Sequence, residues 1–221
     1  KPWMSFRRPY KVAGVKAGRG DTYSLALVPD GHAGLRFRAG QVAWLSLRSL
    51  PFCLQEHPFS FSSSAAHPER LEFSIRELGD MTSTIKYMRP GDTVYLDGPY
   101  GIFTLEQHPA PGYVLLGGGI GAAPFMSMLR TMRDRNDRRP VWFFYGNRTW
   151  DTVTFREELE EVQTQINLHL VHVLERPPEG WSGEAGYITA DMLKRYLPEN
   201  YQDLKFMICG PLPMIRAMEK V

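Results

Sequence analysis

A cluster of glycines near the middle of the chain carries the strongest chemical signal in the sequence. Gly117, Gly119 and Ala122 fit the pattern G-x-G-x-x-G/A, with Gly118 and Gly121 between them. Four apolar residues precede the cluster and apolar residues at helical spacing follow it, which is the strand–turn–helix context of a dinucleotide-binding loop. Glycine lets the backbone approach a pyrophosphate, and the N–H groups of the helix start attract its negative charge. The alternative is a glycine-rich turn that only lets a helix pack closely against a sheet.

Polar residues follow the next strand that the sequence predicts, at 141–145. Asn147 and Arg148 stand there. An arginine at this place suits the 2′-phosphate of NADPH, whereas sites for NADH usually place Asp or Glu near the ribose 2′-hydroxyl. The sequence therefore predicts a preference for NADPH. The alternative is that Arg148 pairs with Asp151 or Glu157 as a surface charge.

The last predicted strand, at 205–208, ends in Cys209, Gly210 and Pro211. The carboxyl ends of parallel strands meet at one edge of a sheet, so we expect this stretch at the mouth of the same crevice. Glycine and proline fix a turn and indicate a shaped pocket wall. A cysteine in such a place is more often an inert buried thiol than a reactive one.

In the first half, residues 57–60 place an imidazole, an aromatic ring and a hydroxyl on one short segment. Pro58 holds His57 extended. Phe59 could stack on a planar cofactor, and Ser60 could hydrogen-bond the cofactor's edge. The alternative is an ordinary strand start with a core phenylalanine.

A second anion cradle is predicted further along the first half. Arg76 ends a strand, and a turn then leads to a helix start with two hydroxyls, Thr82 and Ser83. Such a start suits a phosphate, although the same hydroxyls also suit simple helix capping. Two phosphate-suited helix starts imply two nucleotide cofactors. One is a nicotinamide dinucleotide, and a barrel with a stacking aromatic fits a flavin as the other.

The elements that must position these residues differ between the two halves of the chain. Residues 1–105 are β-rich, and short strands separated by turns predict a barrel or sandwich; we expect strands at 10–15, 22–28, 41–47, 59–62, 71–75 and 93–97, and a helical interruption at 81–88. Residues 106–112, with two prolines and a glycine, are the expected linker. The remaining residues alternate between strands and helices, which predicts a parallel sheet covered on both faces; the strands are 113–116, 141–145, 168–173 and 205–208, and the helices 122–133, 155–165, 189–196 and 212–220.

Composition narrows the classes of function. Of the 221 residues, 43% are hydrophobic and 23% are charged, as in an ordinary globular protein. The net charge of +2 gives no reason to expect nucleic-acid binding. Two cysteines are too few for a four-thiolate iron–sulfur cluster and form no disulfide framework, so a reducing compartment is the default. No metal site is expected, and no apolar run approaches the ~18 residues of a membrane span.

The order of the motifs along nearly the whole chain resembles the ferredoxin–NADP⁺ reductase superfamily; the motifs are HPFSFSSS, FSIRELGDMTSTI, GPYGIF, GGGIGAAP, YGNRTWDTVTFREEL and CGPLPMIRAM. His57 stands where soluble reductases carry arginine, and this form resembles the branch of NADPH oxidases and ferric reductases. The resemblance implies two domains. An all-β antiparallel six-stranded flavin barrel (1–105) is joined by the linker to a Rossmann-like α/β domain with a five-stranded parallel sheet (113–221).

The resemblance also implies roles for individual residues. FAD would be held by His57, Pro58, Phe59 and Ser60, with the phenyl ring against the isoalloxazine and the hydroxyl near its N5 edge. The rest of FAD would meet Ser74, Ile75, Arg76, Met81, Thr82 and Ser83. NADPH would lie along Gly118, Gly119, Gly121, Pro124, Asn147 and Arg148, with its nicotinamide beside Cys209, Gly210, Pro211 and Met214. Ser60 and Cys209 are the residues expected to act catalytically.

Three departures from the family pattern stand out. Ala123 occupies a position where many relatives have threonine, so one phosphate hydrogen bond is expected to be missing. His57 in place of arginine implies a looser grip on the FAD pyrophosphate. The family usually continues to another strand and an aromatic residue beside the flavin, whereas this chain ends at Val221, so we expect an incomplete C-terminal end and a more open nicotinamide side.

The function that the resemblance implies is hydride transfer from NADPH, or NADH, to FAD. Single electrons would then pass to a haem-bearing transmembrane domain of the same full-length polypeptide, which would reduce dioxygen or ferric iron. The unit would work at the cytoplasmic face of a membrane. Two alternatives stay open: a soluble reductase that serves a separate acceptor, such as a haem globin or a ferredoxin, and a non-catalytic nucleotide-sensing module.

Overall fold

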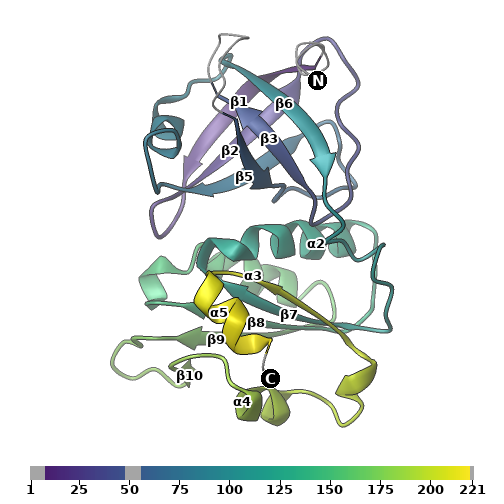
Figure 1. Ribbon diagram of the computed structural model, residues 1–221, viewed down its shortest axis with the longest axis vertical. Coiled ribbons are helices and arrows are strands. Elements are labelled where there is room, and N and C mark those ends of the chain that lie inside the picture. Colours follow the sequence, from purple (N-terminus) through teal and green to yellow (C-terminus); the bar gives the residue numbers. More distant parts are fainter. Residues whose placement is uncertain (1–7, 48–55, 220–221) are drawn as a thin grey trace.

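The computed structural model describes residues 8–47 and 56–219. Two domains are stacked along the long axis of the molecule (Figure 1), a six-stranded sheet above and a five-stranded sheet with its helices below. This arrangement confirms the expected fold, an antiparallel β domain followed by an α/β domain.

The upper domain consists of antiparallel strands in the order β4-β3-β6-β1-β2-β5. Their bounds are β1 Pro9–Ala17, β2 Thr22–Pro29, β3 Val42–Ser46, β4 His57–Ser60, β5 Leu71–Arg76 and β6 Thr93–Tyr100. An isolated bridge between Phe61 and Phe73 connects the segment after β4 to β5 at the opposite edge. The sheet therefore curls toward a closed barrel, which removes its edges. The helical interruption expected at 81–88 is a short 3₁₀ helix, η1 Thr82–Tyr87.

The lower domain is a parallel sheet in the order β10-β9-β8-β7-β11. Its strands are β7 Tyr113–Gly118, β8 Val141–Asn147, β9 Leu168–Leu174, β10 Glu184–Ala185 and β11 Lys205–Cys209. Its helices are η2 Gly119–Ala122, α2 Ala123–Asp134, η3 Trp150–Thr152, α3 Arg156–Gln163, α4 Ala190–Tyr196, η4 Tyr201–Asp203 and α5 Leu212–Met218. The chain adds strands to one side of β7 and then returns to its other side with β11, so the order reverses at β7. Ligands of such sheets bind at this reversal, outside the carboxyl ends of the strands.

Alternate residues of the parallel strands face two different cores, as a period of two requires. Leu115 and Phe143 belong to a cluster that continues through α2 and α3 into the interior of the barrel. Val114 and Phe144 belong to a smaller cluster that includes residues of α4 and α5. Figure 1 shows the same arrangement, with α2 between the sheet and the barrel. One continuous core therefore joins the two domains.

Within residues 8–47 and 56–219, no helix has both the length and the apolar character needed to cross a membrane.

Candidate functional site

The glycine loop lies at the point where the strand order reverses. β7 ends at Gly118, the 3₁₀ turn η2 follows, and α2 starts at Ala123 with Pro124 in its first turn. Gly119 has a φ of +53°, and a Cβ built on it would meet no atom within 4 Å. The loop therefore offers an open, left-handed glycine at which the backbone can approach a bound anion closely.

The neighbouring glycines serve close packing instead. A Cβ on Gly118 would lie 2.6 Å from Met214 Sδ and 2.7 Å from Pro211 Cδ. A Cβ on Gly121 would lie only 2.5 Å from the carbonyl oxygen of Cys209. The functional interpretation and its alternative thus both apply, because Gly119 faces open space while the other two let the 209–211 turn approach.

Cys209 ends β11 beside Gly117, its register partner in β7. Its side chain is half-buried, and burial raises the pKa of the thiol above its usual range. A thiol with a raised pKa is protonated at neutral pH and is a poor nucleophile. What Cys209 can supply at this place is a wall of the crevice.

At the end of β8, the Asn147 side chain is buried, and its Nδ2 has no hydrogen-bond partner among residues 8–47 and 56–219. Arg148 is exposed, and its side chain forms no ion pair within the described part of the chain. Neither alternative partner, Asp151 or Glu157, pairs with Arg148 among the described residues, and the Glu157 carboxylate binds Arg19 and Arg156 instead. The Arg148 guanidinium is therefore free for an anionic ligand.

The sequence reasoning missed Glu175, which lies beside these residues. Its backbone N–H donates to the Asn147 carbonyl at 2.9 Å, and the N–H of Arg176 donates to the Arg148 carbonyl at 2.8 Å. An acidic side chain near the ribose is suited to a 2′-hydroxyl. The signal was available, because Glu175 follows β9 as Arg148 follows β8.

On the barrel, β4 runs along the edge of the sheet and pairs only with β3 among the named strands. His57 and Pro58 are exposed, whereas Phe59 and Ser60 are half-buried. Phe59 packs partly against the core, so it is neither a fully buried residue nor a free one. The Phe59 residue is thus partly accessible, and the Ser60 hydroxyl makes no hydrogen bond within the described residues.

In the second expected cradle, the two hydroxyls bond to nearby backbone groups. The Thr82 hydroxyl accepts from the backbone N–H groups of Leu78 (2.9 Å) and Gly79 (3.0 Å). The Ser83 hydroxyl donates to the Asp80 carbonyl at 2.8 Å. Both hydroxyls therefore stabilise the turn that precedes η1, and no side chain caps the helix itself within the described residues.

The other residues predicted to contact FAD divide into two groups. Ser74 and Ile75 are buried, and the Ser74 hydroxyl donates to Ser62 Oγ at 3.0 Å inside the barrel. Their side chains therefore do not reach the surface. Arg76 is exposed and Met81 is half-buried, so these two can meet a ligand directly.

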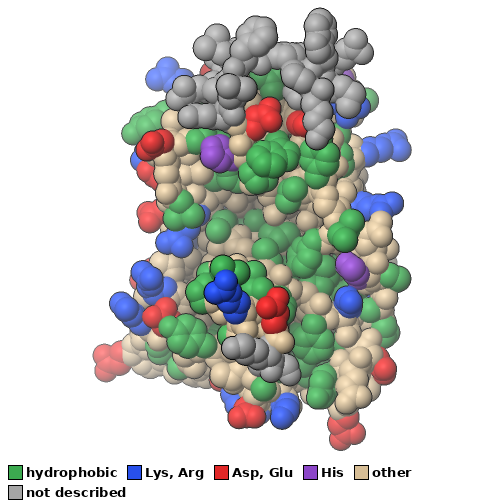
Figure 2. Space-filling view, in the orientation of Figure 1, with side chains coloured by type: hydrophobic (Ala, Val, Ile, Leu, Met, Phe, Trp, Pro, Cys, Tyr) green, Lys and Arg blue, Asp and Glu red, His purple; other side chains and the backbone are tan. Residues whose placement is uncertain are grey.

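The two halves of the candidate site meet, because η2 contacts β5. Figure 2 shows the face that carries α5, where uncharged side chains fill much of the band between barrel and sheet. The charged side chains gather mostly along the outline of the molecule. Such a band suits the flat rings of two cofactors.

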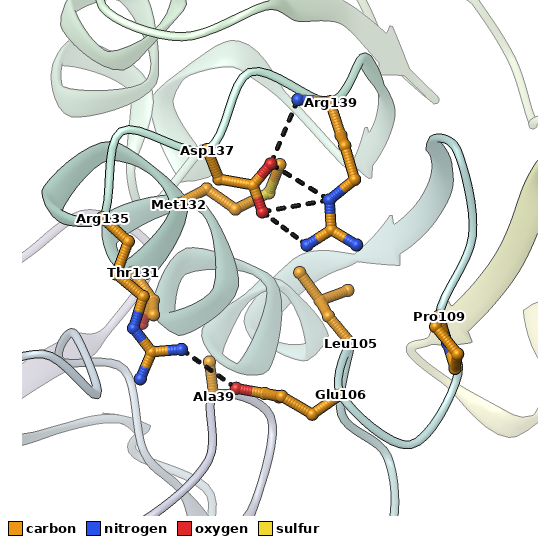
Figure 3. Close-up of a pocket in the computed structure, with 9 residues that line it drawn as sticks. All are labelled: Ala39, Leu105, Glu106, Pro109, Thr131, Met132, Arg135, Asp137 and Arg139. Carbon is orange, nitrogen blue, oxygen red and sulfur yellow. Dashed lines mark hydrogen bonds and ion pairs between the residues drawn. The ribbon is translucent and has the colours of Figure 1, made fainter.

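A pocket with a volume of about 210 Å³ lies away from this site. It is lined mostly by residues of the linker, of the C-terminal end of α2 and of the segment after α2 (Figure 3). Two ion pairs lie along its wall, Arg135 with Glu106 and Arg139 with Asp137. Their charges are already matched, so the cavity shows no group aimed at a ligand.

Comparison with known proteins gives two family matches. A family described as a FAD-binding domain matches residues 9–104, and one described as an oxidoreductase NAD-binding domain matches residues 115–220. The chain belongs to the ferredoxin–NADP⁺ reductase superfamily. Its cofactors are accordingly FAD and a nicotinamide dinucleotide, and the open glycine loop and the accessible Phe59 fit them.

Relatives within this superfamily include NADH-cytochrome b5 reductase 1 of Aspergillus oryzae, 33% identical over 149 residues, or 64% of this chain and 51% of the relative. The enzyme of the same name from Lodderomyces elongisporus is 31% identical over 166 residues, 74% of this chain and 55% of the relative. This chain thus spans about half the length of these curated relatives. The flavohem-like FAD/NAD-binding domain of a Vibrio cholerae nitric oxide dioxygenase shares the fold, with a TM-score of 0.82 at 22% identity, over 96% of this chain and 91% of that one.

Proposed function

We propose that this chain is an NAD(P)H-dependent flavin reductase unit that passes electrons singly to a haem protein. The observation that carries the proposal is the contact between the nucleotide loop η2 and the barrel strand β5, which brings the two cofactor domains together. The bound flavin supplies the redox chemistry, since it can link a two-electron donor to a one-electron acceptor.

The residues of the chain bind the two cofactors and orient them. The N–H groups around Gly119 hold the coenzyme pyrophosphate, Phe59 carries the flavin ring, and the Ser60 hydroxyl hydrogen-bonds its edge. Hydride transfer needs reacting atoms about 3–3.5 Å apart and no general base. We therefore assign no proton-transfer role to Cys209, whose thiol stays protonated.

The choice of coenzyme rests on two side chains of opposite charge. Arg148 favours the 2′-phosphate of NADPH, whereas Glu175 favours the free 2′-hydroxyl of NADH. The names of the relatives support the use of NADH. We propose that the unit accepts both coenzymes, with Arg148 as the source of any preference for NADPH.

Two forms of the haem acceptor are proposed. The resemblance of the His57 motif favours a haem-bearing transmembrane domain in the same full-length polypeptide, with this unit at the cytoplasmic face of the membrane and dioxygen or ferric iron as the final acceptor. The names of the relatives favour a separate haem protein, since they pair a reductase with cytochrome b5.

The test is anaerobic reduction of the purified chain loaded with FAD. Addition of NADH or NADPH should bleach the flavin absorbance, and cytochrome b5 or cytochrome c added afterwards should be reduced. A chain that fails to bind FAD, or whose flavin stays oxidised, would overturn the proposal. Firm binding of both nucleotides without bleaching would favour the nucleotide-sensing alternative.

A further inference from the structure

A polar stripe on α2 lies in the seam between the two domains. Ser127, Arg130 and Thr131 share one face of the helix, because residues three and four apart are neighbours there. Ser127 Oγ donates to the Ser63 carbonyl at 2.6 Å, and the backbone N–H of Ala65 donates to Thr131 Oγ1 at 2.8 Å. Both α2 hydroxyls are buried. α2 therefore binds the segment that directly follows β4.

Arg130 is the centre of this seam. Its Nε and Nη2 donate to the two carboxylate oxygens of Glu158 in α3, each at 2.6 Å. Its Nη1 donates to Glu72 Oε1 in β5 at 2.8 Å and to the Ser62 carbonyl at 2.7 Å. One guanidinium thus joins α3, β5 and the segment after β4 to α2.

The arrangement suits arginine and no other cation. The planar fork meets one carboxylate with two parallel bonds and keeps a third nitrogen for other acceptors. The Arg130 side chain is only 13% exposed. Burial disfavours its charge, but the hydrogen bonds to Glu158 and the charge of Glu72 outweigh burial and raise the pKa of Arg130. A cavity of about 350 Å³ adjoins the cluster and leaves room for water beside its carboxylates.

Two of the three partners of Arg130, Ser62 and Glu72, lie next to segments that we expect to bind FAD. Ser62 lies two residues beyond Ser60, and Glu72 lies in the strand that ends at Arg76. α2 itself begins directly after the glycine loop, seven residues before Arg130, or about 10 Å along the helix axis. The guanidinium therefore fixes two flavin-bearing segments relative to the nucleotide loop.

We propose that Arg130 is a positioning residue for hydride transfer, holding the barrel and the sheet in the register that brings flavin and nicotinamide together. This inference rests on the proposed function, because it concerns the same reaction. A small displacement of reacting groups far from the mutated residue can cost about 100-fold in rate, so the loss of the clamp should appear in the transfer step.

The test compares three variants of the chain. Arg130→Met removes the fork but keeps an unbranched side chain, Arg130→Lys restores a single charge, and Arg133→Met is the matched control. Arg133 lies one turn further along α2 and pairs with Asp134 of the same helix. Two measurements are made: the rate of flavin bleaching at saturating NADH, and the radius of gyration of the FAD-free chain by small-angle X-ray scattering.

We expect Arg130→Met to slow bleaching roughly 10- to 100-fold, with little change in FAD content or in the NADH concentration at half-saturation. Arg130→Lys should recover part of the rate, and Arg133→Met should match the wild type. The FAD-free Arg130→Met chain should have a larger radius of gyration than the control. If Arg130 served local packing alone, Arg130→Met would lower FAD content or stability. It would not slow bleaching while leaving the NADH concentration at half-saturation unchanged.

An Arg130→Met chain that keeps FAD and bleaches within twofold of the wild type would overturn the inference, whatever its radius. If this variant loses FAD, Glu158→Gln replaces it, because it weakens only the bond to α3 and must then show the same slowed transfer. Failure of the wild type to bleach would instead count against the proposed function. The two failures are therefore distinguishable.

Discussion

The two anion cradles predicted from the sequence, one in each domain, differ in what their polar groups do. In the barrel, the hydroxyls of Thr82 and Ser83 bond to their own turn, and η1 is a 3₁₀ helix of six residues. In the sheet, Gly119 faces open space before α2, which has twelve residues. The comparison teaches that hydroxyls at a helix start can bond to their own turn as readily as to a phosphate. A glycine pattern at a strand-order reversal predicts more, because the sheet itself aims the loop at the crevice.

The largest effect is expected from disturbing the close packing that supports the glycine loop of the sheet. Gly121→Ala would place a methyl group 2.5 Å from the Cys209 carbonyl oxygen, a backbone atom that cannot step aside. We expect a loss of about 3 kcal/mol in the free energy of unfolding and loss of bleaching by NADH. FAD binding to the barrel should persist. Gly14→Ala is the control, since a Cβ there meets nothing within 4 Å; equal damage from both changes would contradict this account.

Acid should also act on the sheet, because His172 is half-buried and its two ring nitrogens are inaccessible to solvent. Burial, with a smaller contribution from the charge of Arg156, lowers the pKa of His172 to about 4, and neither nitrogen has a hydrogen-bond partner in the described part of the chain. As pH falls below the ordinary pKa of about 6.5, the unfolded chain binds a proton that the folded chain refuses, so stability falls down to about pH 4. The loss is at most about 3 kcal/mol.

Urea titrations between pH 6.5 and pH 4 would measure this loss of stability. His172→Phe should flatten the dependence of stability on pH between 6.5 and 4. An unchanged slope in that variant would assign the acid sensitivity to other groups.

Replacing Arg148, which is exposed at the end of β8, tests which coenzyme the chain prefers. Arg148→Ala should weaken NADPH about tenfold or more, the value of a charge-assisted hydrogen bond, and leave NADH nearly unchanged. Glu175→Gln should weaken NADH slightly and leave NADPH unaffected or improved. Steady-state kinetics with both coenzymes measures the ratio, and an equal loss for both in Arg148→Ala would remove that residue from its assigned role.

The smallest effect on stability and cofactor binding is expected from a change at Thr82, at the start of η1. Thr82→Ala deletes an acceptor of two backbone N–H groups and should cost about 1 kcal/mol of stability. FAD affinity should fall only modestly. Thr84→Ala, in the same helix, removes a single bond to the Met81 carbonyl and serves as control. A tenfold drop in FAD affinity in Thr82→Ala alone would mean that this hydroxyl binds phosphate after all.

Much of the fold followed from local pattern. Gly119 and the strand at 113–116 could be interpreted because motif and periodicity lie in one short stretch. β10 could not be predicted, because a strand of two residues has no period. Arg130 was missed for a different reason: its partners Glu72 and Glu158 lie far away in the sequence, and only the stacking of two domains brings them together. The state of the Thr82 hydroxyl was undecided because capping and phosphate binding need the same residue types.

The hydrophobic cluster that runs from the barrel interior through α2 into the sheet has a consequence for protein engineering. Neither domain has a complete hydrophobic core by itself, because cutting the chain at residues 106–112 would expose apolar surface on both pieces. A chimera that joins this barrel to the coenzyme domain of a relative must therefore keep α2 of this chain. Otherwise the residues that pack against α2 must be redesigned.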